Sequence, residues 1–375
     1  MEQTIPTTWD LAASLVCLDV VATARERTRC REHLERLSDS SLDGESIQRE
    51  AVADLQRVIG FDRWCWPLAD PDSHVPLGGL AEHDYGPSLP RALELEFSGN
   101  DFAPKHVLAR RGVSAASLSA ETGGDLARSP RWDEVMRPFG IGDVGTVACR
   151  DALGCWGWIE AYRDGSDPAF DADDLQLLTA IGPSLGSALR KTFLVPREDG
   201  AVEPSPPGVI VLGPDLRVVS WTAAARTWID ALPAAALFSA WGILPPVVYP
   251  VATLSRSRNA EEEAHALERT VDGRWLMIQG ARLEGDNEDG KIAVTLRRAT
   301  PSEMFDLLCR VYALTQRERD VVAAIIVGLD TRGITERLFI SRHTVQDHLK
   351  SVFEKLGVHS RRELLATFNT VSGST

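Results

Sequence analysis

The pattern of apolar and polar positions is most regular between residues 301 and 375, where apolar residues recur every three or four positions. Residues that cap or end helices punctuate this pattern: Thr315 with Glu318, Gly328, Asp330, Ser341, Gly357, and Ser360 with Glu363. The segment predicts a connecting helix over 300–313 and four further helices. Their apolar positions would fill one small core: Val321, Val322, Ile325, Ile334, Leu338, Ile340, Val345, Leu349, Val352, Phe353 and Leu356.

The first 194 residues predict a mixture of helices and strands. A charged helix is expected over residues 8–38, capped by Thr8, and it either packs on the region that follows or helps to build a dimer. Further helices are expected at 44–59, 88–97, 129–139 and 171–192, with Pro183 inside the last. Runs rich in Val and Trp predict strands at 61–69, 144–151 and 155–164.

Residues 195–208 are polar and rich in proline, which predicts a linker. After it, a hairpin with its turn at 213–215 is expected, then a helical middle. Three more strands fit at 265–270, 274–283 and 291–298. A chain of 375 residues therefore predicts several domains rather than one core.

Charge is distributed unevenly along the chain. The net charge is −14, yet residues 301–375 hold ten Lys and Arg against nine Asp and Glu. The acidity belongs to the earlier domains, so it does not argue against a small DNA-binding surface at the C-terminal end. No apolar run is long enough for a membrane span, no secretory signal begins the chain, and the six cysteines form no framework; we expect a cytoplasmic protein.

Two short helices joined at residues 339–341 have the arrangement of a helix-turn-helix, whose second helix places side chains in the major groove. The polar positions of that second helix are Arg342, His343, Gln346, Asp347, Lys350 and Lys355. Gln can read adenine, a carboxylate can accept from cytosine, and Lys can donate to guanine. The alternative is an ordinary solvated helix face.

Residues 314–366 resemble the DNA-binding domain of the LuxR family. The residues that carry the resemblance are Leu314, Thr315, Arg317, Glu318, Gly328, Ile334, Leu338, Ile340, Ser341, Thr344, Val345, His348, Leu349, Lys355, Leu356, Gly357, Val358, Ser360, Arg361 and Glu363. The resemblance implies that the helix over 342–356 reads double-stranded DNA, with Gln346, Asp347 and Lys350 facing bases. Thr344, His348 and Lys355 would lie nearer the phosphates or support the helix. The helix from Arg361 would make the contact of a homodimer, and RNA polymerase is a further partner for such a regulator.

Two positions depart from the family pattern. Gly333 stands where relatives usually have Glu, which removes a capping-box partner and costs about 0.5–1 kcal/mol in helix propensity. Gln346 stands where many relatives have Lys, so the preferred DNA site cannot be transferred from them.

The two earlier domains resemble known sensor modules through their order of elements. Residues 40–194, after the N-terminal helix of 1–39, resemble an α+β GAF domain, and 209–299 resemble an α+β PAS domain. With the all-α helix-turn-helix domain of 314–375, these make a multidomain regulator. An unidentified small-molecule effector at the sensor domains is expected to control DNA binding.

Aromatic residues are concentrated in the GAF-like region: Trp64, Trp66, Tyr85, Trp132, Trp156 and Trp158. They either fill the core or wall a ligand pocket. No cofactor is evident, because the local attachment motifs for bilin, haem and flavin are missing.

Other chemistry finds little support in the sequence. Residues 285–291 fit the spacing of a phosphate-binding loop, but the acidic side chains and the following strand argue for a hairpin turn. No catalytic constellation or metal-ligand spacing is present, so we expect no enzyme. The alternative to a regulator is a protein–protein adaptor, or a degenerate regulator that never binds DNA.

Overall fold

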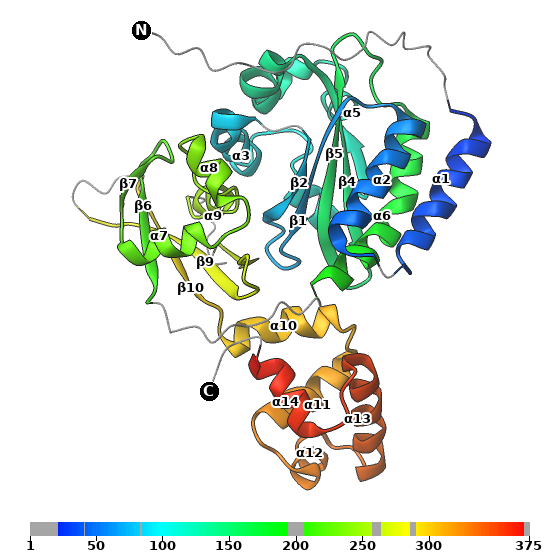
Figure 1. The fold of residues 1–375 in the computed structure, drawn as a ribbon, viewed down its shortest axis with the longest axis vertical. Coiled ribbons are helices and arrows are strands. Elements are labelled where there is room, and N and C mark those ends of the chain that lie inside the picture. The colour runs from blue at the N-terminus through cyan, green and yellow to red at the C-terminus, as the bar shows by residue number, and fades with distance from the viewer. Residues whose placement is uncertain are drawn as a thin grey trace.

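The computed structural model describes residues 22–40, 42–82, 85–193, 206–256, 264–285 and 290–370. They form two regions that are each built on a five-stranded antiparallel sheet, followed by a C-terminal helical region (Figure 1). Helix α10 (Pro301–Val311) lies between the helical region and both sheet regions. Within those described ranges, no helix is long and apolar enough to cross a membrane.

The first sheet has the strand order β2-β1-β5-β4-β3. Its strands are β1 (Arg63–Ala69), β2 (Pro76–Ala81), β3 (Ala115–Ser117), β4 (Ile141–Asp151) and β5 (Gly154–Asp164). The predicted strands β1, β4 and β5 are confirmed, whereas β2 and β3 were not expected. β2 contains two glycines and a proline, which disfavour strands. Gly79 is required there, because a Cβ would lie 2.3 Å from the carbonyl oxygen of Trp66.

Two helices cover one face of this sheet, α2 (Gly44–Ile59) and α6 (Ala172–Thr192), and α1 (Ala24–Leu37) packs on their outer side (Figure 1). The prediction of one helix over 8–38 is wrong, because Thr23 is extended (φ −66°, ψ 155°) and caps α1 with Glu26. The proposed cap at Thr8 lies outside the described residues. α1 packs on its neighbours through Cys30, Leu34 and Leu37, as one of the two interpretations expects.

The opposite face is covered by short segments. These are η1 (Gly86–Ser88), α3 (Leu89–Phe97), α4 (Lys105–Arg111), α5 (Leu118–Thr122), η2 (Leu126–Arg128), η3 (Trp132–Met136) and η4 (Arg137–Phe139). The α-helix predicted over 129–139 is wrong: η3 is a π-helical turn and η4 a 3₁₀ turn. Pro138 lies inside this stretch and cannot donate the backbone hydrogen bond that a regular helix needs.

The second sheet has the order β7-β6-β10-β9-β8. Its elements are β6 (Gly208–Leu212), β7 (Val218–Trp221), α7 (Ala223–Asp230), α8 (Ala235–Ala240), α9 (Val248–Leu254), β8 (His265–Arg269), β9 (Trp275–Arg282) and β10 (Ile292–Arg298). The predicted hairpin and the three later strands are confirmed. One face of the sheet packs on α7 and α9, and α9 also contacts α3 of the first region.

The C-terminal helical region follows α10 and contains α11 (Gln316–Ile326), α12 (Thr331–Leu338), α13 (Arg342–Leu356) and α14 (Arg361–Thr370). The capping box of Thr315 and Glu318 forms as predicted. Gly357 ends α13 in the left-handed conformation with φ 67°. Local capping signals and the shared core therefore select the same helices, which confirms the predicted all-α arrangement.

Candidate nucleic-acid interface

α12 and α13 form a helix-turn-helix whose second helix is capped at its start. Ser341 Oγ accepts a hydrogen bond from the Thr344 amide at 3.1 Å. In the turn before it, Phe339 adopts a left-handed conformation with φ 56°, and its side chain is 92% exposed. The chain can therefore reverse between the two helices within three residues.

A small apolar core fixes the orientation of α13. Its side chains Val345, Leu349 and Val352 are buried in the same cluster as residues of α11, α12 and α14. These positions are spaced by three and four residues, so they occupy one face of the helix. The opposite face is consequently held towards solvent.

A buried carboxylate attaches α13 to α11. Glu318, whose side chain is 5% exposed, accepts hydrogen bonds from Lys355 Nζ at 2.6 Å and from Ser351 Oγ at 2.6 Å. Burial raises the pKa of Glu318, but the hydrogen bonds from Lys355, Ser351 and the Thr315 amide outweigh burial and bring this pKa down to about 2. The sequence predicted only the capping role of Glu318, because nothing local signals a partner 37 residues away.

The exposed face of α13 contains most of the predicted DNA-binding residues. Arg342, His343, Gln346, Asp347 and Lys350 are all exposed with both sheet regions present. His343 Nδ1 lies 3.6 Å from Asp347 Oδ1, and Lys350 Nζ lies 4.0 Å from Glu354 Oε1. Such exposed pairs contribute little to stability, so these side chains are available to a ligand.

The remaining three predicted residues are placed differently. Thr344 and His348 are half-buried, and the Thr344 hydroxyl lies 2.8 Å from Ser341 Oγ. Lys355 donates to Glu318 and to the carbonyl oxygen of Ala313 at 2.9 Å. Lys355 was expected either to lie near the phosphates or to support the helix. Its contacts with Glu318 and Ala313 fit the supporting role.

Sequence comparison agrees with this geometry. A family model described as "Bacterial regulatory proteins, luxR family" matches residues 312–368. The spore germination protein GerE of Bacillus subtilis is 40% identical over 50 residues, which are 13% of this chain and 68% of that protein. The chain belongs to the luxR family of bacterial regulatory proteins.

Other relatives share the same segment. An HTH-type transcriptional regulator of Mycobacterium tuberculosis is 49% identical over 53 residues, or 14% of this chain and 6% of that protein. The nitrate/nitrite response regulator protein homolog of Haemophilus influenzae is 45% identical over 49 residues, which are 13% of this chain and 24% of that protein. The chain thus spans only a small part of these longer relatives, and the likeness concerns the luxR-type domain.

Gly333, the departure from the luxR-family pattern, lies in the first turn of α12. Its amide donates to Asp330 Oδ1 at 2.8 Å, so the cap of this helix is intact. A Cβ added at Gly333 would make only ordinary contacts of 3.4 Å with Asp330 and Leu329. The glycine is therefore not required by space, and it costs helix propensity and the second half of a capping box.

The six aromatic residues expected either to fill the core of the first region or to wall a ligand pocket are dispersed. Trp64, Trp66 and Trp156 pack on the face covered by α2 and α6. The others lie in two clusters on the opposite side: Tyr85 and Trp132 in one, and Trp158 in another. Trp156 and Trp158 point to opposite faces because Trp156 is the extra residue of a β-bulge, where Cys149 pairs with Gly157 and Arg150 with Cys155.

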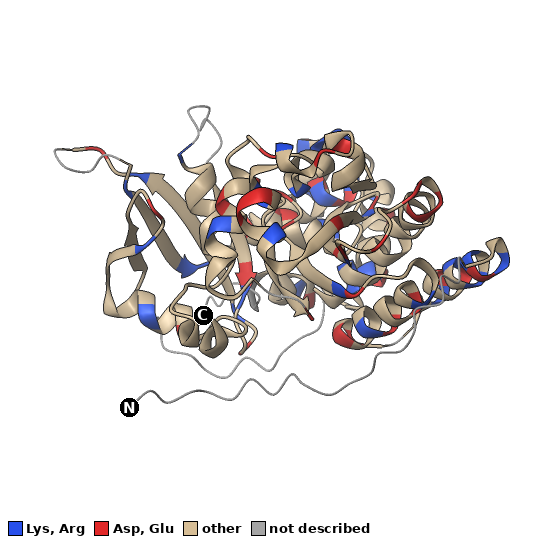
Figure 2. Ribbon diagram, turned by 90° about the horizontal axis from the view of Figure 1, so that it is seen from above, with Lys and Arg blue, Asp and Glu red and all other residues tan. Residues whose placement is uncertain are grey.

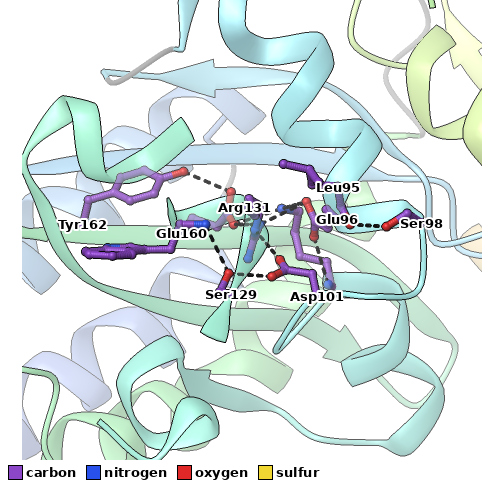
Figure 3. A network of polar contacts seen from close by, with 10 residues as sticks. Leu95, Glu96, Ser98, Asp101, Ser129, Arg131, Glu160 and Tyr162 are labelled. Atoms are coloured by element: carbon purple, nitrogen blue, oxygen red, sulfur yellow. Dashed lines mark hydrogen bonds and ion pairs between the residues drawn. The ribbon is translucent and has the colours of Figure 1, made fainter. Parts of the chain in front are cut away.

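A buried ionic network, not an apolar pocket, occupies the centre of the face covered by α3 and α4 (Figure 3). Lys105 Nζ lies 2.7 Å from Glu96 Oε2 and 3.0 Å from Glu160 Oε1. Arg131 contacts the same two carboxylates and also Asp101, with Nε 2.8 Å from Oδ2. All five side chains are at most 6% exposed.

The charges in this network stabilise one another. Burial raises the pKa of Glu96, but Lys105 and Arg131 outweigh burial and bring it down to about 2. Burial lowers the pKa of Lys105, and the carboxylates of Glu160 and Glu96 more than restore it, so the net direction is upward. The sequence did not reveal this network, because its members are scattered between residues 96 and 160 and belong to no motif. In the described part of the chain, no group of His, Cys, Asp and Glu suits a metal ion.

Proposed function

We propose that this luxR-family chain is a sequence-specific transcriptional regulator that inserts α13 into the major groove of double-stranded DNA. The observation that carries the proposal is the exposed polar face of α13 on a helix whose other face is fixed by the core. Gln346, Asp347 and Lys350 would contact base edges, and Arg342 and His343 would lie at the groove edge near the helix N-terminus.

On the side that Figure 2 shows, the charged residues of the sheet regions are of mixed sign. A protein with net charge −14 should therefore approach DNA through the helical region, where the basic residues balance the acidic ones. Regulators with a helix-turn-helix commonly bind two half-sites as dimers, and we assign the homodimer contact to α14.

The two sheet regions are proposed to be sensors, GAF-like and PAS-like. The support is their order of elements: two antiparallel sheets, each interrupted by short helices, with a long closing helix, α6, in the first region. A small-molecule effector would act through these regions. The dispersed aromatic residues and the buried ionic network fill the interior of the first region, so we propose that the effector binds elsewhere on the sheet regions.

Helix α10 is the proposed route from the sensors to DNA. Arg310 on α10 donates to the carbonyl oxygen of Pro71 at 3.0 Å, and Arg190 on α6 donates to that of Val311 at 2.7 Å. The second region contacts α10 through Arg297, 2.6 Å from Glu303. On its other side α10 packs on α14, where the rings of Phe305 and Phe368 lie 5.7 Å apart. A shift of either sheet region would thus move the proposed dimer helix.

The test is fluorescence anisotropy of the complete chain with DNA from upstream of its own gene, over a series of salt concentrations. We expect selective binding that weakens with salt. Lys350→Glu should weaken binding at least about tenfold, because a base or phosphate contact becomes a repulsion. Arg217→Glu, on a turn of the second region with the side chain 88% exposed, is the matched control and should bind normally. Equal binding to random DNA, or none, would favour the adaptor or degenerate regulator.

The role of α10 has a separate test. The Arg190→Gln and Arg310→Gln double variant removes two of the contacts that attach α10 to the first region. It should change the DNA affinity of the complete chain, whereas Arg217→Gln should not. An unchanged affinity in the double variant would mean that α10 does not transmit the state of the sheet regions.

A further inference from the structure

The two sheet regions meet at a pair of buried carboxylates that accept hydrogen bonds reciprocally. Glu268 on β8 of the second region accepts from the Gly78 amide on β2 of the first region at 2.8 Å. Asp70, just after β1 of the first region, accepts from the Leu267 amide on β8 at 2.7 Å. Glu268 is 5% exposed and Asp70 is 2% exposed. Separation of the regions would therefore expose both carboxylates and both amides to water.

Other backbone amides complete the surroundings of these carboxylates. Glu268 Oε1 also accepts from the Arg269 amide at 2.9 Å. Asp70 Oδ1 accepts from the amides of Asp72 and Ser73 at 2.8 and 3.0 Å. Asp70 therefore keeps two partners within its own region when the joint opens, whereas Glu268 keeps only one.

No cation neutralises Glu268 among the described residues. The Arg269 guanidinium lies over the Trp275 ring and donates to the Gly273 carbonyl oxygen. His265, on the same strand, faces Asp72 at 3.5 Å, and Arg310 of α10 lies 3.3 Å from that same carboxylate. The charged group that acts on Glu268 is the carboxylate of Asp70, which has the same sign.

Burial raises the pKa of Glu268 to about 7, and the nearby charge of Asp70 adds to the rise, although the amides of Gly78 and Arg269 oppose it. When the regions separate, Glu268 is solvated and its pKa returns towards the ordinary 4.5. Between pH 4.5 and about 7, Glu268 is therefore protonated in the docked arrangement and ionised in the separated arrangement.

We propose that this joint between the two sheet regions is proton-sensitive, with Glu268 as the group that takes up the proton when the regions dock. The contribution of the protonated carboxyl group to docking is complete below pH 4.5. It is lost as the pH rises to about 7, where the docked Glu268 ionises beside Asp70, and docking does not weaken further at higher pH through this group. Within the window the docking constant falls up to about tenfold per pH unit.

The joint also lies next to the anchor of α10. The turn that begins with Asp70 continues into Pro71 and Asp72, the two residues that Arg310 contacts. Opening of the joint would release this turn and hence one end of α10. This consequence rests on the proposed function, whereas the proton sensitivity of the joint does not.

Hydrogen–deuterium exchange of the complete chain tests the joint directly. The amides of Gly78 and Leu267 donate the two bonds across it, and those of β5 residues 158–164 serve as internal controls. After correction for the intrinsic pH dependence of exchange, protection at Gly78 and Leu267 should fall up to about tenfold per unit between pH 5.5 and 7 and then level off. The β5 amides should keep constant protection.

Glu268→Gln should abolish the pH dependence and leave the joint protected at every pH, and Asp215→Asn, on an exposed turn of the same region, should behave like the natural chain. Protection that does not change between pH 5.5 and 7.5, or that still falls in Glu268→Gln, would overturn the proposal. If Glu268→Gln does not fold, the profile of the natural chain decides alone. A pH-dependent joint together with a DNA affinity that is identical in the natural chain and Glu268→Gln would retain the joint and reject its link to DNA binding.

Discussion

Replacement of Lys105 by Met should strongly destabilise the first sheet region. Lys105 has a side chain that is 3% exposed and lies within 3.0 Å of two buried carboxylates, Glu96 and Glu160. The network of Figure 3 contains three carboxylates and two cations, so the loss of Lys105 leaves three negative charges facing Arg131 alone. Removal of one partner of a buried ionic group costs about 3–5 kcal/mol.

That cost should appear as a large shift in the thermal midpoint. For a domain of this size each 1 kcal/mol lowers Tm by about 2–4 °C, so Lys105→Met should lower the calorimetric transition by roughly 6–20 °C. Lys191→Met removes a lysine that is 45% exposed on α6 and should shift Tm by much less.

A double variant separates charge imbalance from loss of packing. In Lys105→Met with Glu96→Gln, one positive and one negative charge are removed together, so the network returns to its natural excess of one carboxylate. Most of the lost stability should return. If Lys105→Met costs less than about 1 kcal/mol, or if the double variant is less stable than the single one, the network is not held by charge balance.

Three further predictions concern the helical region. Gly333→Ala should stabilise α12 by about 0.5–1 kcal/mol in urea unfolding, since the added Cβ meets only ordinary contacts; a loss of stability would contradict this. Ser341→Ala removes the cap of α13 and should cost about 1 kcal/mol and weaken DNA binding, while Ser302→Ala, an exposed serine of α10, should change neither. Glu318 has a lowered pKa of about 2, so its contribution is complete above its ordinary pKa and lost as the pH falls from about 4.5 to 2. Acid unfolding of Glu318→Gln should lack that component; an unchanged acid transition would refute the stabilising role of the contacts from Glu318 to Lys355 and Ser351.

The helical region was predictable from sequence because its signals are local. Each cap lies within three residues of its partner, as for Thr315 and Glu318, and the apolar spacing selects the buried face without knowledge of other segments. The exposed residues of α13 follow once that face is fixed. The partnership of Lys355 with Glu318 was not predictable, since it depends on how α11 and α13 pack.

The interior of the first region was harder to predict from the sequence, because its contacts join segments that are distant along the chain. Side chains alternate along a strand, so the sequence of β5 suggests that Trp156 and Trp158 share a face. A bulge in the pairing of β5 with β4 places them on opposite faces instead. The ionic network likewise joins α3, α4, the residue before η3 and β5, which meet only after the sheet is assembled. A pattern of residue types along one segment contains no information on such pairings.

The exposure of α13 limits how the sheet regions can act on DNA binding. Arg342, Gln346 and Lys350 are exposed although both sheet regions are present, so neither region covers the proposed reading face in this arrangement. Control by simple masking of that face would require a different arrangement of the regions. The contacts that do exist converge on α10, which packs on α14 rather than on α13. Since α14 is the proposed dimer helix, these contacts favour control through the spacing of two reading helices on DNA over control through access to one of them.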